Sequence, residues 1–500
     1  MSYQRVDVCI IGSGFAGSLL AMMLRRRGHT VAMVEKDRHP RFAIGESSTP
    51  LANFKLRQIS AKYGLPEIES LSRYDSWKTH HPSLTCGIKR GFAYFAHQSG
   101  ASFGTGPDHE HELLVTANSS RRVSDLHWLR SDVDAYLVDQ ARSLGVDFFD
   151  LASVQSLVPD AARDTACVSI TREGERHDIE SKFVVHASGN QRGQDSLRGQ
   201  RGQDSLLPVR EMRTCSRAIF AHFANVRLWA AMLADSGHPT ADHPFVCDDS
   251  ALHHVIDGGW MWQLRFEDDT VSAGLMLDAR RFPLDESISV DDEWQKWLAK
   301  YPSIAAQFAG AQIVRPAGGL QRTGPLQQPC SQIATSWFAR LPAAAGYSDP
   351  LYSTGIGHSL FAIERLADAI DRIDDRHAFH QSMVKYDDSL RQEIDLIDRI
   401  VSLSYRCGAS FDDYVAVTML YFAAATTCET RTQSTGSNES PPLFLMANDP
   451  ALLDAIEQAE NAVGGPQSLE QVIARGVAPL NHVGLFAPAV PRMYRYTAAE

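Results

Sequence analysis

The sequence predicts an α/β protein with a doubly wound domain near its start, and three consecutive features carry that prediction. A strand-like apolar run at 6–11 leads into a Gly-x-Gly-x-x-Gly turn, a helical stripe follows, and a second apolar strand at 30–34 ends in an acid. This unit binds dinucleotides, because the glycines let backbone approach a pyrophosphate at the positive end of the helix. The acid accepts hydrogen bonds from ribose hydroxyls. The cofactor-binding residues expected here are Gly12, Gly14, Phe15, Ala16, Gly17 and Glu35.

Later segments supply further elements of the same domain and a second sheet. A helix is expected from Arg130 to Leu137, and a strand at 181–186 leads into Ala187-Ser188-Gly189, a loop typical of the exit from a doubly wound sheet. Strand-like runs further on predict an antiparallel substrate sheet inserted into this domain. These runs are 219–223, 260–264 and 271–277.

Beyond Gly355 the pattern is largely helical. Apolar stripes at 360–373 and 394–400 predict helices, residues 431–442 have the Ser, Thr, Asn and Pro content of a loop, and a last helical segment begins near Pro450. We therefore expect a nucleotide-binding domain over 1–358 and a mostly helical region over 359–500. The inserted sheet is expected to come from about 80–125 and 210–335.

Residues 191–208 contain two nearly identical nine-residue copies of a polar, glycine-containing unit. With so little apolar surface the repeat cannot order itself by burial. A duplication within a surface loop and a functional lid are both compatible with it.

Composition narrows the classes of partner. The net charge of -12 disfavours nucleic acid and anionic membranes as partners, and no apolar run is long enough to span a bilayer. The eight cysteines form no Cys-x-x-Cys pair and the histidines show no metal-like spacing, so neither a disulfide framework nor a metal site is expected. We expect a cytoplasmic protein.

The glycine turn alone does not separate FAD from NAD, and the segment His39 to Pro50 bears on that choice. It reads His-Pro-Arg-Phe-Ala-Ile-Gly-Glu-Ser-Ser-Thr-Pro, with the Pro and Gly content of a shaped loop. It resembles the Pro-Arg-x-x-(Ile/Val)-Gly-Glu-(Ser/Ala) segment of flavin-dependent halogenases, which lies over the flavin in that family. The resemblance implies FAD contacts for Arg41, Ile44, Gly45, Glu46 and Ser47.

A lysine between two glycines supplies the second motif. Cys86-Gly87-Ile88-Lys89-Arg90-Gly91 reads as a strand, and a lysine among apolar residues can lose its proton or direct an ammonium at a polarised oxygen. Halogenases place their active-site lysine here, so the resemblance implies a catalytic role for Lys89.

The third motif, residues 346–356, reads Gly-Tyr-Ser-Asp-Pro-Leu-Tyr-Ser-Thr-Gly-Ile directly before a helix. Unpaired amides at a helix start can hold an anion. The resemblance implies flavin contacts for Asp349, Gly355 and Ile356, and halide binding by Ser353, Thr354 and Gly355. It also implies that Arg130 contacts FAD.

Two departures from the family pattern concern the substrate. Tryptophan halogenases carry a glutamate where this chain has Tyr352, and phenol-acting relatives lack that acid, which favours a phenol. The Trp-x-Trp-x-Ile-Pro motif of the family appears as Trp260-Met261-Trp262-Gln263-Leu264-Arg265, without the proline. The substrate-pocket candidates are Trp260, Trp262, Tyr352, His97 and His222.

The flavin contact is altered as well. Leu341-Pro342 stands where related monooxygenases have Gly-Asp, which puts the usual carboxylate contact to the ribityl chain in doubt.

The resemblance therefore implies a flavin-dependent halogenase that uses reduced FAD, O2 and chloride or bromide to make hypohalous acid. Lys89 would direct the acid onto a phenolic or other electron-rich aromatic substrate, free or tethered to a carrier protein, in secondary metabolism. A separate flavin reductase would supply the reduced FAD. The alternatives are an FAD-dependent aromatic hydroxylase, a related flavin reductase, or a flavin-binding module without activity.

Overall fold

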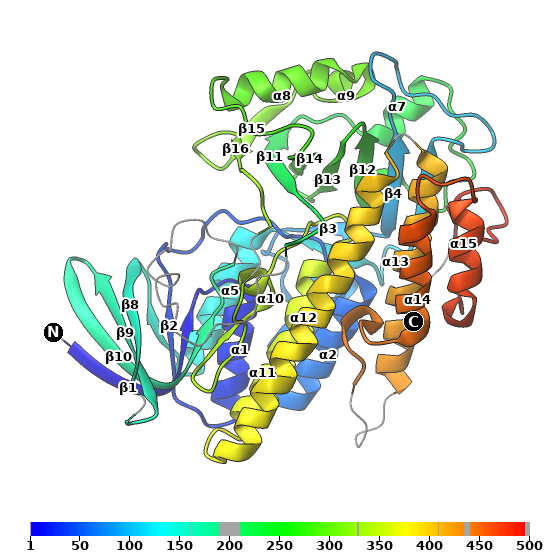
Figure 1. Cartoon of the computed structure of the whole chain (residues 1–500). Coiled ribbons are helices and arrows are strands. Elements are labelled where there is room, and N and C mark those ends of the chain that lie inside the picture. Colours follow the sequence, from blue (N-terminus) through cyan, green and yellow to red (C-terminus); the bar gives the residue numbers. More distant parts are fainter. Residues whose placement is uncertain are drawn as a thin grey trace.

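The computed structural model describes residues 2–160, 162–189, 211–327, 330–408, 410–434 and 441–495. Within these residues the chain forms two large sheets, one above the other in Figure 1, with long helices crossing from one to the other. The tandem repeat at 191–208 lies outside the described residues, so the choice between loop and lid stays open.

The first sheet has the strand order β7-β2-β1-β10-β9-β8, and β17 pairs with β10. β1 pairs in parallel with β2 and β10, whereas β8 and β9 form an antiparallel arm. Its strands are β1 (Ser2–Ile11), β2 (Val31–Val34), β7 (Asp147–Phe149), β8 (Ala152–Asp160), β9 (Thr165–Arg172), β10 (Glu175–His186) and β17 (Phe338–Arg340).

Both faces of the first sheet are covered, as the run of apolar residues at 6–11 predicts. Val8 and Ile10 of β1 belong to a core shared with the helices, and Cys9 and Ile11 to a core shared with the β8–β9 arm. Alternate residues of a strand point to opposite faces, so an unbroken apolar run serves two cores. The predicted α/β fold is confirmed. Helices on this sheet include α1 (Phe15–Arg26), α5 (Arg130–Ser143), α10 (Pro342–Ala345) and α11 (Thr354–Ile370).

The second sheet has the order β15-β11-β14-β13-β12-β4-β5-β18, and β16 pairs with β11. β11, β14 and β13 pair antiparallel as expected, but β12 with β4 and β5 with β18 are parallel pairs. The strands are β4 (Gly91–Ala96), β5 (Glu112–Thr116), β11 (Ser216–Ala224), β12 (Ala251–Ile256), β13 (Gly259–Arg265), β14 (Val271–Asp278), β15 (Gln312–Arg315), β16 (Gln321–Arg322) and β18 (Met493–Tyr494).

Further helices and strands lie between and around the two sheets, and α8 and α9 share a core with the second sheet. β3 and β6 form a separate antiparallel pair. These elements are α2 (Pro50–Tyr63), α3 (Pro66–Glu69), η1 (Ser70–Ser72), α4 (Tyr74–His80), β3 (Cys86–Lys89), β6 (Asp125–Trp128), α7 (Trp229–Asp235), η2 (Cys247–Asp249), α8 (Val290–Ala299) and α9 (Pro302–Gln307).

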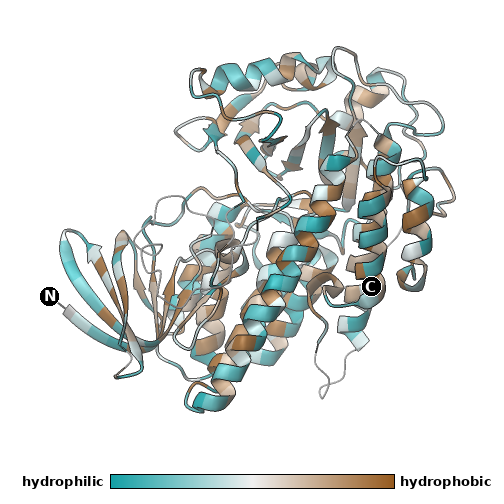
Figure 2. Ribbon diagram, viewed as in Figure 1, coloured by the Kyte–Doolittle hydropathy of each residue, from teal (hydrophilic) through white to brown (hydrophobic). Residues whose placement is uncertain are grey.

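The C-terminal part is helical, as predicted. Figure 1 shows α12 running across both layers, and Figure 2 shows apolar and polar residues alternating along it, with Phe379, Met383, Tyr386 and Leu390 buried. No helix among the described residues is long and apolar enough to cross a membrane. The elements are α12 (Arg376–Arg406), α13 (Phe411–Ser434), η3 (Phe444–Met446), α14 (Pro450–Ala462), α15 (Leu469–Gly476) and η4 (Ala478–Leu480).

One boundary of this region was predicted too early. The loop expected from Arg431 begins after Ser434, because α13 continues for one more turn with the hydroxyl of Ser434 bonded to the carbonyl of Thr430. Residues 435–440, the middle of that expected loop, lie outside the described residues.

A fully buried carboxylate, Glu393, fastens α12 to α11. It accepts two hydrogen bonds from Arg365, at 2.7 and 2.6 Å, and one from the backbone amide of Phe444 at 2.7 Å. Burial opposes its ionisation, but Arg365 and His358 lower the pKa of Glu393 to about 2. The carboxylate is therefore charged at neutral pH.

We predict that Glu393→Gln lowers the free energy of unfolding by about 3 kcal/mol, because a buried guanidinium is left without its counter-ion. Urea unfolding at pH 7 measures this. Glu460→Gln is the matched control: Glu460 also accepts two hydrogen bonds from an arginine, Arg399, but is more exposed, so its loss should cost less than about 1 kcal/mol.

The Glu393 effect should also depend on pH in a defined direction. Its folded-state pKa lies below the unfolded value of about 4.3, so the stabilisation is present above that value and is lost as pH falls toward about 2. The difference between wild type and Glu393→Gln should shrink below about pH 4. A difference that stays constant down to pH 3 contradicts this account.

Candidate active site

The glycine turn leaves β1 where only glycine fits. Gly12 has φ +106°, and a Cβ there would stand 2.6 Å from the carbonyl carbon of Ala187. A Cβ on Gly17 would stand 2.2 Å from the carbonyl oxygen of Gly12, so α1 can pack against its strand only without a side chain. These contacts position the first turn of α1 at the end of the sheet.

Gly14 faces two guanidinium groups. A Cβ on Gly14 would meet Nη2 of Arg130 at 3.4 Å and Nη2 of Arg41 at 3.6 Å, and α1, which starts at Phe15, has no side-chain cap. The positive end of a helix and two arginines thus converge on one point, which is an environment for a pyrophosphate.

Glu35, at the end of β2, is buried beside this turn. Its Oε2 accepts hydrogen bonds from the backbone amide and hydroxyl of Ser13, at 3.1 and 3.0 Å, and lies 3.3 Å from Nη2 of Arg41. Burial opposes ionisation, but Arg41 and the backbone amides hold the pKa of Glu35 below its usual range. Gly12, Glu35, Arg41 and Ser188 line a small pocket at this edge of the sheet.

Asp134 joins three segments of the site and was not singled out from the sequence. Its carboxylate, fully buried, accepts hydrogen bonds from Nε and Nη2 of Arg130 at 2.8 and 2.9 Å and from the amide of Phe15 at 3.1 Å. Arg130 Nη1 donates to the carbonyls of Ile44 and Gly45 at 3.0 and 3.1 Å. The spacing of one helical turn between Arg130 and Asp134 is the sequence feature that could have revealed the pair.

The loop that contains Glu46 crosses from the first sheet to the second. Both carboxylate oxygens of Glu46 and the hydroxyl of Ser47 are buried without a hydrogen-bond partner. Nε2 of His222, on β11, lies 3.1 Å from Oε1 of Glu46, and the ring of Phe42 packs edge-on against His222 at 5.1 Å. Unpartnered buried polar atoms are costly, so this loop fits a polar ligand such as a flavin ring.

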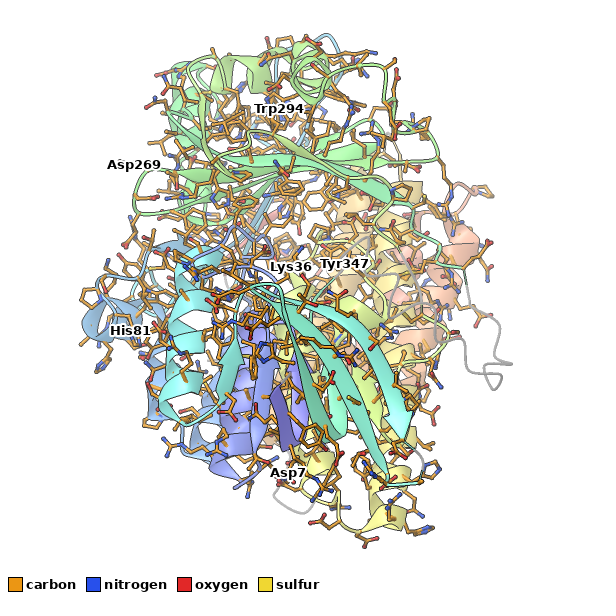
Figure 3. The ribbon with its side chains drawn as sticks, turned by 90° about the vertical axis from the view of Figure 1, so that its left-hand side faces the viewer. Asp7, Lys36, His81, Asp269, Trp294 and Tyr347 are labelled. Atoms are coloured by element: carbon orange, nitrogen blue, oxygen red, sulfur yellow. The ribbon has the colours of Figure 1, made fainter. Side chains whose placement is uncertain are left out.

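Figure 3 shows how the ends of the first sheet meet the second one. Asp7, in the middle of β1, lies far from the second sheet, whereas Lys36 and Tyr347 lie at the level where the two sheets meet in that view. Lys36 follows Glu35, and Tyr347 precedes Asp349 by two residues. The carboxyl ends of the parallel strands therefore face the second sheet, which is where open α/β sheets bind ligands.

Lys89, the last residue of β3, is fully buried. Its Nζ donates a hydrogen bond to the carbonyl of Ser48 at 2.6 Å and lies 4.0 Å from the ring centroid of Phe92. Burial lowers the pKa of Lys89, and the charge of Asp125, opposite it on β6, acts in the other direction. The amine can therefore change its protonation state far more readily than an exposed lysine.

Two buried carboxyl groups escaped the sequence analysis: Asp125, opposite Lys89, and Glu429, whose charge interacts with that of Asp125. Asp125 accepts a hydrogen bond from the side-chain amide of Asn53 at 2.6 Å, and burial raises its pKa while Lys89 lowers it. Burial and the charge of Asp125 raise the pKa of Glu429, on α13, to about 8. Both lie in segments distant from Lys89 in the sequence, so no local motif predicts them.

The turn before α11 is fixed by Asp349. Its Oδ2 accepts hydrogen bonds from the hydroxyls of Ser216 and Tyr405 at 2.7 and 3.0 Å, and burial raises its pKa to about 6. Ser353 has φ +53° and precedes α11, which begins at Thr354. A Cβ on Gly355 would meet nothing within 4 Å, so the start of this helix borders free space, whereas Ile356 is buried.

The aromatic pocket candidates other than the histidines belong to one core that also contains Phe92. Tyr352 stacks on Tyr421 at 4.3 Å and shares a hydrogen bond with Ser404 at 2.7 Å. Trp260 Nε1 donates to the hydroxyl of Tyr405 at 3.2 Å, and Trp262 lies in the same core.

His97 lies on the other side of the second sheet. Along β4, Phe92 and Tyr94 face the core that contains Tyr352, and Phe95 faces the opposite core. His97 continues the second row: its ring contacts His254, with 2.8 Å between Nε2 and Nδ1, and packs near Phe103. The structure thus places Tyr352, Trp260 and Trp262 in the same core as Phe92, the ring that contacts Lys89. His97 lies on the opposite face of the sheet.

Comparisons with known proteins agree with this geometry. A family model described as FAD dependent oxidoreductase matches residues 7–241. Monodechloroaminopyrrolnitrin halogenase PrnC of Pseudomonas fluorescens is 29% identical over 416 residues, covering 81% of this chain and 68% of the relative. A 1H-pyrrole-2-carbonyl-[peptidyl-carrier protein] chlorinase of Pseudomonas fluorescens is 24% identical over 427 residues, covering 83% and 87%.

A solved structure has the same fold over nearly the whole chain. The crystal structure of halogenase PltM in complex with phloroglucinol and FAD superposes with a TM-score of 0.83 at 22% identity, covering 99% of this chain and 100% of that one. The chain is thus similar over most of its length to proteins named as halogenases, and the family model and the solved structure agree with the dinucleotide site of an FAD-dependent oxidoreductase.

Proposed function

We propose that this protein is a flavin-dependent halogenase, and that Lys89 directs hypohalous acid onto a phenolic or other electron-rich aromatic substrate. The observation that carries the proposal is the setting of Lys89: a fully buried amine beside an aromatic ring, with a carboxyl group opposite it across the β3–β6 pair. Burying an amine in this way lowers the free energy of unfolding unless its charge or hydrogen bonds are compensated. A pKa shifted strongly from its ordinary value at such a group is characteristic of active sites.

FAD fits the site at the edge of the first sheet. Arg41, Arg130 and the start of α1 would hold its pyrophosphate, and Glu35 its ribose. Glu46 and Ser47 would face the flavin ring with the polar atoms that now lack partners. When bound, reduced FAD and O2 supply the oxidising equivalent that turns halide into hypohalous acid.

The start of α11 supplies the proposed halide site. The first amides of a helix have no intrahelical partner, and they carry the positive end of the helix dipole. Ser353, Thr354 and Gly355 stand at this position, next to free space at Gly355. A halide held there would be close to the turn that Asp349 fixes.

Lys89 can act in either protonation state. As an ammonium its Nζ donates a hydrogen bond to the oxygen of hypohalous acid and makes the halogen more electrophilic. As an amine it takes the halogen from hypohalous acid as the O–halogen bond breaks and water leaves, then passes the halogen to the ring, which loses a proton, and the amine is regenerated. Both routes fix the attacking halogen at one place, so the position halogenated depends on how the ring is held. The aromatic core of Tyr352, Trp260 and Trp262 provides the apolar wall for that ring.

Two observations favour a phenol as the substrate. Tyr352 offers no carboxylate to the ring, and a phenol supplies its own electron density. The similar structure of PltM holds phloroglucinol, a phenol. A relative acts on a pyrrole tethered to a carrier protein, so a carrier-bound substrate is the second form to test. Aromatic hydroxylation without halide is less favoured, because it does not use Lys89.

We further propose that a separate reductase delivers reduced FAD, since the sequence carries one dinucleotide-binding unit. The protein would act in the cytoplasm, where reduced nicotinamide is available to such a reductase, and in secondary metabolism.

Arg41→Met should weaken FAD binding at least about tenfold, because the guanidinium faces Gly14 and its loss removes a charge-assisted contact to phosphate. Titration of FAD fluorescence measures the Kd. Arg38→Met is the control: Arg38 lies in the same loop but is exposed and pairs with Asp150. Equal losses in the two variants would remove Arg41 from the proposed pyrophosphate site.

Lys89→Met should lower kcat/KM for halogenation of a phenol at least about 100-fold, because the group that directs the oxidant is lost. Hypohalous acid should still form, and a diffusible trap of active halogen should report it. Lys296→Met, an exposed lysine on α8, should behave as wild type.

Mass spectrometry of products with reduced FAD, O2 and bromide decides the outcome. Full halogenation by Lys89→Met, or an oxygenated product that forms without halide, is incompatible with the proposal.

Asp125→Asn should shift the pH dependence of halogenation. The carboxylate opposite Lys89 raises the pKa of the amine, so its removal lowers that pKa further, and the limb of the kcat/KM profile that reports Lys89 should move to lower pH. The asparagine can still accept the hydrogen bond from Asn53. Asp249→Asn, whose carboxyl lies beside Arg121, should leave that limb unchanged. An unmoved limb in Asp125→Asn contradicts the coupling.

A further inference from the structure

A cluster of two histidines and a glutamate lies at the edge of the second sheet, apart from the site described above. His109 is in the segment between β4 and β5, Glu112 is the first residue of β5, and His243 precedes η2. One side-chain ligand atom from each lies within 4.8 Å of the others. His109 Nδ1 is 2.8 Å from Glu112 Oε1, and His243 Nε2 is 3.2 Å from Glu112 Oε2.

The cluster is buried but its polar atoms are not satisfied. The side chains of His109 and Glu112 are at most 1% exposed, and that of His243 is 6% exposed. Nε2 of His109, Oε2 of Glu112 and Nε2 of His243 make no hydrogen bond; their nearest polar neighbours are one another's charged groups and Asp242, at 3.2 and 3.7 Å. Leaving buried polar atoms unpaired is costly, and a cation coordinated by them removes that cost.

From this geometry we propose that His109, Glu112 and His243 bind a Zn²⁺ ion. Two imidazoles and one carboxylate are a ligand set of zinc sites, whereas Ca²⁺ and Mg²⁺ require oxygen ligands. Adjacent ligands around a tetrahedral zinc stand about 3.3 Å apart, close to the separation of Glu112 Oε2 and His243 Nε2. The exposed carboxylate of Asp242, 3.7 Å from Nε2 of His109, or a water completes the shell.

No sequence motif predicts this site, because the ligands combine a short His-x-x-Glu spacing with a histidine more than a hundred residues away. The expectation of no metal site rested on short spacings alone. Folding brings the ligands together because β5 pairs with β4 and η2, which follows His243, also contacts β4.

The ion would have a structural role. It would tie the start of β5 to the segment before η2, and Arg492, which precedes β18, already donates to the carbonyls of His109 and Glu110 at the same corner. Three segments from different parts of the sequence would then be fixed at one edge of the sheet. No ligand belongs to the halogenation site, so catalysis should depend on the metal only through stability.

The test uses the full chain, purified without a polyhistidine tag and dialysed against metal-free buffer. We expect wild type to bind one Zn²⁺ per chain, measured by mass spectrometry of bound metal and by equilibrium dialysis against Zn²⁺ alone. His243→Ala and the isosteric Glu112→Gln should bind Zn²⁺ at least about tenfold more weakly. Wild type, but neither variant, should gain in Tm when Zn²⁺ is added.

His238→Ala is the matched control, because this histidine lies in the same segment and hydrogen-bonds the carbonyl of Phe103 instead of joining the cluster. It should bind Zn²⁺ as wild type does. Replacing Zn²⁺ by Co²⁺ should give the visible absorption of a tetrahedral ion in wild type and not in His243→Ala. Wild type that binds no more Zn²⁺ than His243→Ala overturns the proposal, as does an equal loss in His238→Ala. The FAD affinity of each variant shows that it is folded.

Discussion

The ion pair between Arg130 and Asp134 is the interaction on which the rest of the site depends. A fully buried carboxylate needs donors on every side, and Asp134 obtains them from Arg130 and from the first amide of α1. The remaining donors of Arg130 hold the carbonyls of Ile44 and Gly45, which fixes the loop that continues to Ser48. Because the carbonyl of Ser48 accepts the hydrogen bond of Lys89, the pair sets the path from the dinucleotide turn to the lysine.

The two ends of that path differ in their surroundings, and the difference suits their chemistry. At the first sheet, arginines and a helix start surround Gly14, which favours an anion. At the second sheet, Lys89 lies against Phe92 and its aromatic core, where burial favours the neutral amine. A charged cofactor and an apolar ring can therefore occupy one protein without sharing one pocket. The helical region joins them, because Tyr421 of α13 packs on Tyr352 directly before α11.

The sequence was sufficient to predict a feature where the residues that cause it lie in one continuous segment. Gly12 and Gly17 could be assigned because backbone contacts exclude any side chain, and the strand of Lys89 follows from its apolar neighbours. It was insufficient where function comes from contacts between distant segments. Asp125 faces Lys89 only after β3 and β6 pair, and the face of the sheet that His97 occupies follows from register. The parallel pairing of β5 with β18 has no local sequence pattern at all.

That last pairing bears on how the protein is made. β5 lies near residue 114, and its partner β18 near residue 493, so the edge of the second sheet is completed only when the ribosome has synthesised almost all of the chain described here. Until then β5 presents an open edge, whereas the aromatic wall around Tyr352 gains its partner Tyr421 earlier, when α13 is made. The strands of the first sheet are complete once β17 has been made, and the helices α11 and α12 that share its core follow directly. A nascent chain would thus complete the strands of its cofactor-binding sheet before the aromatic core around Tyr352, and close the edge of its second sheet last.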